Sequence, residues 1–81
     1  MSRKALGTLT ETMFYVLMSF LKRERCGTEV AEFVEQKTGG RVRIGPGTLY
    51  TILGKFEEEG LLQEVAVEGR KRTYQLTDQG R

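Results

Sequence analysis

The residues with the clearest chemistry are three adjacent cations, Arg70, Lys71 and Arg72, which follow Gly69. Glycine is typical of tight turns, so this basic run is predicted to lie on a protruding turn between two strands. Positive side chains on such a turn can contact the phosphate groups of a nucleic acid. A short basic run is also common on ordinary exposed surface, and these residues alone leave that alternative open.

A second group of candidates lies on a helix that is predicted to start at Pro46. Its buried face is predicted from apolar residues at helical spacing, namely Leu49, Ile52, Leu53 and Phe56. The opposite face carries small, hydroxyl and basic side chains, which suit contacts with base edges and phosphates. These candidates are Gly47, Thr48, Tyr50, Thr51 and Lys55, with Arg43 in the basic segment before the helix. A plain solvated face, with Tyr50 as half-buried packing, is the open alternative.

Composition excludes several function classes. The chain has 81 residues, no histidine and a single cysteine, Cys26, so neither an internal disulfide nor a metal or cofactor site is expected. No pair of acid and base groups suggests an enzyme. The apolar stretch 13–21 is too short to span a bilayer, and a cytoplasmic location is expected. A net charge of only +2 means that the placement of the cations must carry any argument for nucleic acid.

The predicted fold is a single α+β domain over residues 1–81, mainly α, with three helices followed by a two-stranded β-hairpin. A capping box at 8–11 predicts the start of the first helix, which then runs to about Lys22. Thr28 is the expected cap of the second helix, and Gly39-Gly40 the expected end. The third helix is expected between Pro46 and Gly60, because proline suits a first helical turn and glycine a helix end. The strands are predicted at 65–68 and 73–76, with Gly69 between them.

The first predicted helix is apolar around much of its circumference. The residues of its core stripe are Leu9, Met13, Val16, Leu17 and Phe20. Phe14, Met18 and Leu21 lie beside that stripe. A helix this apolar is expected either to be central in the domain or to be shared with a partner.

The order of helices and hairpin, together with specific motifs, resembles the PadR family of transcriptional regulators. The strongest match is Gly45-Pro46-Gly47-Thr48-Leu49-Tyr50, followed by Phe56-Glu57-Glu58-Glu59-Gly60-Leu61. The basic hairpin Glu68-Gly69-Arg70-Lys71-Arg72-Thr73-Tyr74 also matches. The resemblance runs from about Leu9 to the end of the chain, in the same order.

This resemblance implies a winged helix-turn-helix protein that binds double-stranded operator DNA as a dimeric repressor. The helix from Pro46 would enter the major groove, and the residues that correspond to its exposed part are Thr48, Tyr50, Thr51 and Lys55. Arg70, Lys71 and Arg72 correspond to the wing, which would contact the DNA backbone or the minor groove. The resemblance further implies a small-molecule effector or another cellular signal.

Two features depart from the family pattern. The second helix opens with Gly27-Thr28-Glu29, where the family often has Gly-Tyr-Glu. The long C-terminal helix through which the family dimerises is expected to be absent, or only begun at 77–81, where Thr77-Asp78 would cap it.

A different interpretation is a protein-interaction module without DNA binding, because the carboxylates of Glu57-Glu58-Glu59 would repel phosphates.

Overall fold

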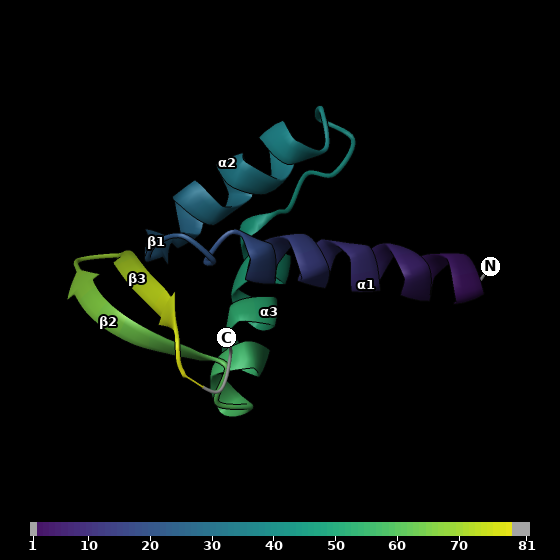
Figure 1. Ribbon diagram of the computed structural model, residues 1–81. Helices are drawn as coiled ribbons and strands as arrows, with labels where there is room; N and C mark the ends of the chain where they lie inside the picture. Colours follow the sequence, from purple (N-terminus) through teal and green to yellow (C-terminus); the bar gives the residue numbers. More distant parts are fainter. Residues whose placement is uncertain (1, 79–81) are drawn as a thin grey trace.

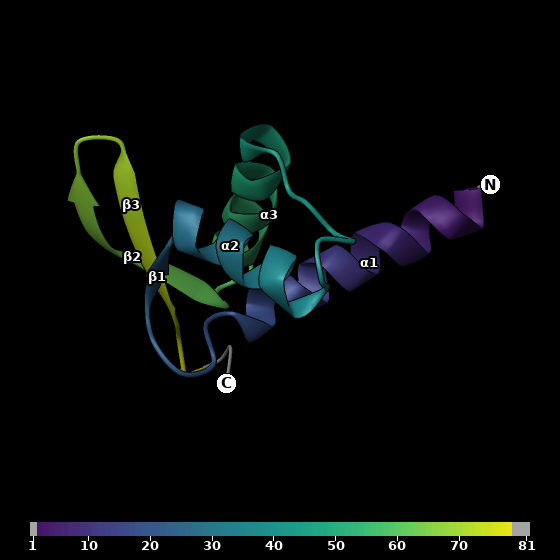
Figure 2. The same cartoon turned by 90° about the horizontal axis from the view of Figure 1, so that it is seen from above.

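The computed structural model describes the backbone of residues 2–78 and the side chains of residues 10–78. Its elements are α1 (Ser2–Met18), β1 (Arg25–Cys26), α2 (Gly27–Lys37), α3 (Pro46–Glu58), β2 (Leu62–Glu68) and β3 (Lys71–Leu76). Figure 1 shows α3 between α1 and the β2–β3 hairpin, which is the wing, and Figure 2 gives the same arrangement from above. The predicted class, α+β with three helices and a small antiparallel sheet, is confirmed.

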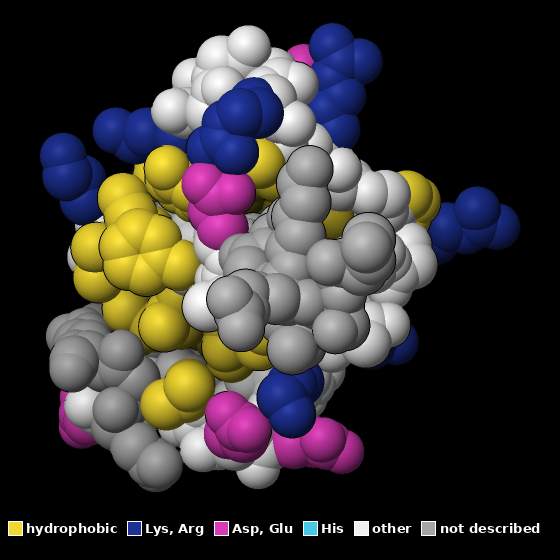
Figure 3. All heavy atoms as spheres, turned by 90° about the vertical axis from the view of Figure 1, so that its right-hand side faces the viewer, with side chains coloured by type: hydrophobic (Ala, Val, Ile, Leu, Met, Phe, Trp, Pro, Cys, Tyr) yellow, Lys and Arg dark blue, Asp and Glu magenta, His cyan; other side chains and the backbone are white. Residues whose placement is uncertain are grey.

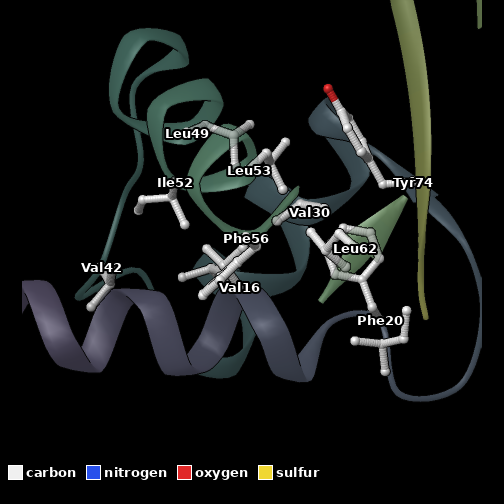
Figure 4. Close-up of a cluster of buried hydrophobic side chains, with 12 residues drawn as sticks. Val16, Phe20, Val30, Val42, Leu49, Ile52, Leu53, Phe56, Leu62 and Tyr74 are labelled. Carbon is white, nitrogen blue, oxygen red and sulfur yellow. The ribbon is translucent and has the colours of Figure 1, made fainter. Parts of the chain in front are cut away.

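One hydrophobic core joins all the elements except β1 (Figure 4). Its buried members are Val16, Phe20, Val30, Val34, Val42, Leu49, Ile52, Leu53, Phe56, Leu62, Tyr74 and Leu76. The predicted inner face of α3 is confirmed in full, because all four of its apolar residues are buried. From the stripe predicted on α1, Val16 and Phe20 are buried and Met13 and Leu17 are partly buried. The side chain of Leu9 lies outside the described residues.

The bounds of α1 differ from the prediction at both ends. The helix begins at Ser2, so the predicted capping box at 8–11 lies inside it. Glu11 instead accepts two hydrogen bonds from the guanidinium of Arg41, at 3.0 and 2.7 Å, and so ties α1 to the loop before α3. The helix ends at Met18 rather than Lys22, because the N–H of Phe20 bonds to the carbonyl three residues back and the last turn tightens.

The start of α2 is also corrected. The residue that precedes the helix is Cys26, not Thr28, and the helix begins at Gly27. The carboxylate of Glu29 accepts the backbone N–H of Cys26 at 2.9 Å, which is half of a capping box. The predicted end is confirmed: α2 stops at Lys37, and the glycines at 39–40 have φ of +63° and +84°.

The sheet has three strands, in the order β1-β3-β2, where the sequence predicted a two-stranded hairpin. Arg25 pairs with Tyr74, and Cys26 pairs with Thr73. A strand of two residues is too short to produce an alternating pattern, so periodicity could not reveal it. This short strand joins the connection between α1 and α2 to the base of the wing.

The wing strands are longer than predicted, and this changes where the cations lie. Lys71 and Arg72 belong to β3, so the turn contains only Gly69 and Arg70. Gly69 has φ of +63°, a conformation that favours glycine at the tip of a two-residue hairpin loop. The register shifts between Glu64 and Ala66, where a bulge increases the local twist of the strand pair.

The connection between α3 and β2 is bonded to the segment that follows the wing. The backbone N–H of Thr77 donates to the carbonyl of Leu61 at 3.0 Å, and its hydroxyl donates to the carbonyl of Gly60. The helix that Thr77-Asp78 was expected to cap falls on residues 79–81, outside the described residues. Along the part of the chain that the structure describes, no helix is both long and apolar enough to cross a membrane.

We predict that Leu53→Ala lowers the free energy of unfolding by roughly 2–5 kcal/mol, because it leaves a cavity at the centre of the core. Leu53 is 0% exposed. Val67→Ala on the wing, where the side chain is 54% exposed, is the control and should cost less than about 0.5 kcal/mol. Urea denaturation measures both. Equal losses of stability for the two variants would contradict this account of the core.

Candidate nucleic-acid interface

The outer face of α3 is the first part of the candidate interface. Since the inner apolar residues are buried, the side chains between them point away from the core. Those predicted as site residues are all exposed, namely Gly47, Thr48, Tyr50, Thr51 and Lys55. The Thr51 hydroxyl donates to the carbonyl of Gly47 at 2.9 Å, which leaves its oxygen lone pairs available as acceptors. The ammonium of Lys55 lies 3.7 Å from a carboxylate oxygen of Glu59.

The wing is the second part. Arg70, Lys71 and Arg72 are exposed at its tip and at the start of β3. Arg72 lies 3.7 Å from the carboxylate of Glu64 on the neighbouring strand. No ion pair joins Arg70 or Lys71 to a carboxylate among the described residues. These two side chains therefore offer the least neutralised positive charge on the wing.

Helix α3 and the wing face a shared hollow. One groove of ≈ 470 Å³ is lined by Tyr50, by residues 26–29 at the start of α2, and by the cations at 70–72. A second groove of ≈ 560 Å³ lies between Tyr50, Gly54 and Glu57 of α3 and residues 69, 70, 72 and 74 of the wing. Both ribbon views place α3 and the wing next to each other (Figures 1 and 2). The edge of α3 that carries Tyr50 and the wing cations thus lie on the same side of the molecule.

The grooves bring together only some of the predicted residues. Tyr50 and the three wing cations line them, whereas Gly47, Thr48, Thr51 and Lys55 lie on the outer face of α3 outside the lining. Arg43 is set apart in the loop before α3, where its guanidinium lies 3.9 Å from the carboxylate of Glu35.

Sequence reasoning missed the contribution of α2 to the groove. Gly27, Thr28 and Glu29 line it opposite the wing. The hydrogen bond from the backbone N–H of Cys26 lowers the pKa of Glu29 below its ordinary value of 4.5, and Arg23 and Lys71 lower the pKa further by their charge. The sequence did carry one signal for this contribution, because Gly27 and Glu29 match the first and third residues of the Gly-Tyr-Glu pattern of the family. Its position beside the wing depends on the pairing of β1 with β3, which no local pattern shows.

The family of the chain follows from comparison with known sequences. The model of the transcriptional regulator PadR-like family matches residues 16–81. The chain belongs to the PadR-like family. Its members are transcriptional regulators, so the expectation that the chain is not an enzyme is confirmed. No curated protein matches the sequence.

Solved structures share the fold of this PadR-like chain. A transcriptional regulator from Clostridium thermocellum is 25% identical with a TM-score of 0.75, and the match covers 99% of this chain and 76% of that one. H. salinarum RosR is 23% identical with a TM-score of 0.76, over 85% of this chain and 61% of RosR. Bacillus subtilis PadR, solved in complex with operator DNA, is 24% identical with a TM-score of 0.70, over 84% of this chain. The match spans only 41% of that PadR.

We predict that Glu29→Gln destabilises the folded chain at neutral pH. The lowered pKa means that folding favours the charged carboxylate, so this stabilisation is full above pH 4.5 and is lost as the pH falls through the pKa of the folded state. Because the side chain is 37% exposed, we expect a loss of only about 0.5 kcal/mol at pH 7.

Urea titrations of wild type and variant across the acidic range measure this difference in stability. The gap between the two should close as the pH falls. Glu32→Gln, on the exposed side of the same helix, is the matched control. A gap that stays constant with pH would show that the charge of Glu29 does not stabilise the start of α2.

Proposed function

We propose that this PadR-like chain binds double-stranded operator DNA through the outer face of α3 and the wing. The observation that carries the proposal is that Tyr50 of α3 lines the same grooves as Arg70 and Arg72 of the wing. A helix in the major groove with a basic wing against the backbone needs these two features on one side of the molecule. The operator complex of Bacillus subtilis PadR, which shares this fold, supports the proposal.

In this proposal the amino-terminal turns of α3 contact base edges. Gly47, Thr48 and Thr51 are small and exposed there, so the helix can approach the floor of the groove. Tyr50 and Lys55 contact the sugar-phosphate backbone from the flanks. Small hydroxyl groups do not define a base code, so sequence preference also arises from DNA shape.

The cations are expected to differ in how strongly they contact phosphates, because some lie beside carboxylates. Lys55, Arg72 and Arg43 each lie 3.7–3.9 Å from a carboxylate. Exposed pairs of this kind contribute only about 0–1 kcal/mol, so a phosphate can displace them. Within residues 10–78 no carboxylate pairs with Arg70 or Lys71, and these two are proposed as the main phosphate contacts of the wing.

The acidic run 57–59 gives less support to a protein-interaction module in the structure than it did in the sequence alone. Glu57 lines the groove with Arg70 and Arg72, and Glu59 lies beside Lys55. Their negative charges are therefore partly offset by neighbouring cations. A purified chain that captured a stoichiometric protein partner and showed no affinity for any duplex would favour the alternative.

We expect the double variant Arg70→Ala with Lys71→Ala to bind a DNA duplex at least tenfold more weakly. The slope of log affinity against log salt concentration should also fall in magnitude by roughly 2, because each phosphate that a cation neutralises contributes about 0.9 to that slope. The probe is a duplex that the wild-type chain selects from a random pool, titrated at several salt concentrations. Lys22→Ala is the control, because this cation lines a separate hollow with Phe33 and Lys37. If the double variant kept the wild-type slope, the wing would not contact phosphates.

We further propose that the chain acts as a homodimer through an α1 surface formed by Phe14, Met18 and Leu21. Phe14 and Met18 lie on α1, and Leu21 follows the helix in the connection to β1. Phe14 and Leu21 are 59% and 64% exposed. Figure 3, which shows the side of the molecule on the right in Figure 1, has an apolar patch on its surface. A two-fold dimer suits a palindromic operator, and an occupied operator excludes other proteins, which supports repression. The small-molecule effector implied by the family resemblance remains part of this proposal.

Phe14→Glu with Leu21→Glu should convert the protein to a monomer, because burying two carboxylates in an apolar interface without partners is costly. Sedimentation equilibrium measures the mass. Val67→Glu is the matched control, since Val67 is exposed on the wing, away from the α1 surface. A wild-type chain that sediments as a monomer, or a double variant that stays dimeric, would reject this surface.

A further inference from the structure

The phenol of Tyr50 rests against the backbone of Gly27. Gly27 is the first residue of α2 and is buried, whereas Tyr50 projects from α3 and is 40% exposed. A methyl group on Gly27 would lie 2.6 Å from Oη and 3.0 Å from Cζ of Tyr50. Carbon atoms do not approach other atoms this closely, so the two side chains cannot both occupy these positions.

Glycine is needed here for space and not for its backbone conformation. The glycines with positive φ among the described residues are Gly39, Gly40, Gly60 and Gly69, and Gly27 is not one of them. By contrast, a methyl on Gly45 would meet no atom within 4 Å. The close approach to Tyr50 therefore distinguishes Gly27 from a glycine whose Cβ position is empty.

The backbone at Gly27 is held from both sides along the chain. The preceding residue, Cys26, pairs with Thr73 of β3, and its N–H donates to the carboxylate of Glu29. Tyr50 is the freer partner, because only the far end of its side chain meets Gly27. A methyl on Gly27 would thus displace the phenol and leave the helix in place.

We propose that Gly27 is a positioning residue for the DNA-binding surface: by having no side chain, it lets the phenol of Tyr50 point into the groove shared with Arg70 and Arg72. The inference rests on the proposed DNA-binding function. It adds a residue from α2 to that function, and it gives Gly27 a role that acts through Tyr50.

The geometry is tested without DNA. The chain has three tyrosines, so the ring resonances of ¹³C-labelled tyrosine resolve a small set, and Tyr50→Phe identifies its signal. Gly27→Ala should shift the signal of Tyr50 and leave those of Tyr15 and Tyr74 in place. Gly45→Ala, the matched control, should shift none. An unchanged Tyr50 signal in Gly27→Ala would overturn the proposal.

The functional step is tested with the duplex that the wild-type chain selects from a random pool. Gly27→Ala should weaken binding about tenfold in the wild-type background and less than about twofold in a Tyr50→Ala background, because the two changes act on one contact. Tyr50→Ala alone should weaken binding by a similar factor. Equal weakening in both backgrounds, or unchanged binding by Tyr50→Ala, would overturn the role of Gly27.

The failures of the two proposals are distinguishable. If the wild-type chain selects no duplex, DNA binding fails, while the tyrosine spectra still decide the contact. If the Gly27→Ala variant is unfolded, the double variant Gly27→Ala with Tyr50→Ala identifies the cause. A folded double variant would show that the added methyl group clashes with the phenol of Tyr50, which supports the proposal. Continued unfolding in the double variant would show that Gly27 serves the backbone of α2, which overturns the proposal.

Discussion

The buried face of α3 organises this domain, because the other helices and the sheet pack around it. Leu49, Ile52, Leu53 and Phe56 are buried against residues from α1, α2 and the sheet. With these side chains in the core, the direction of every other side chain on α3 is fixed by helical geometry. The same packing that supplies stability in a small domain therefore also presents a rigid outer face to DNA.

The short strand β1 connects the wing to the helices. The pairing of β1 with β3 ties the start of α2 to the wing, so α2, α3 and the hairpin converge on the groove around Tyr50. The ion pairs near this groove, Arg23 with Glu29 and Arg72 with Glu64, are exposed and separated by 3.6 and 3.7 Å, and such pairs are exchanged at little cost. Shape is thus held by apolar packing and backbone hydrogen bonds, while the charges stay available to a ligand.

The modest net charge of +2 is compatible with a DNA-binding surface because the charge is unevenly placed. Carboxylates lie beside Arg41, Arg43 and Lys55, whereas Arg70 and Lys71 at the wing have no ion pair with any carboxylate in the part of the chain that the structure describes. Phosphate contact depends on the local potential at the wing, not on the sum over the chain. The apolar side chain of Phe14 lies on α1 and that of Leu21 just after it, so the α1 surface and the wing are separate features of one small domain.

The fold class, the inner face of α3, the basic wing and the family could all be predicted from the amino-acid sequence, because helical periodicity and turn residues are local signals. It did not determine the two-residue strand β1, the true ends of α1, or the contact between Gly27 and Tyr50. The strand β1 and the contact between Gly27 and Tyr50 depend on segments that are distant in sequence, such as Cys26 with Thr73. Such residues come within bonding distance only when the chain is packed, so the assembly of the groove could not be predicted from local patterns.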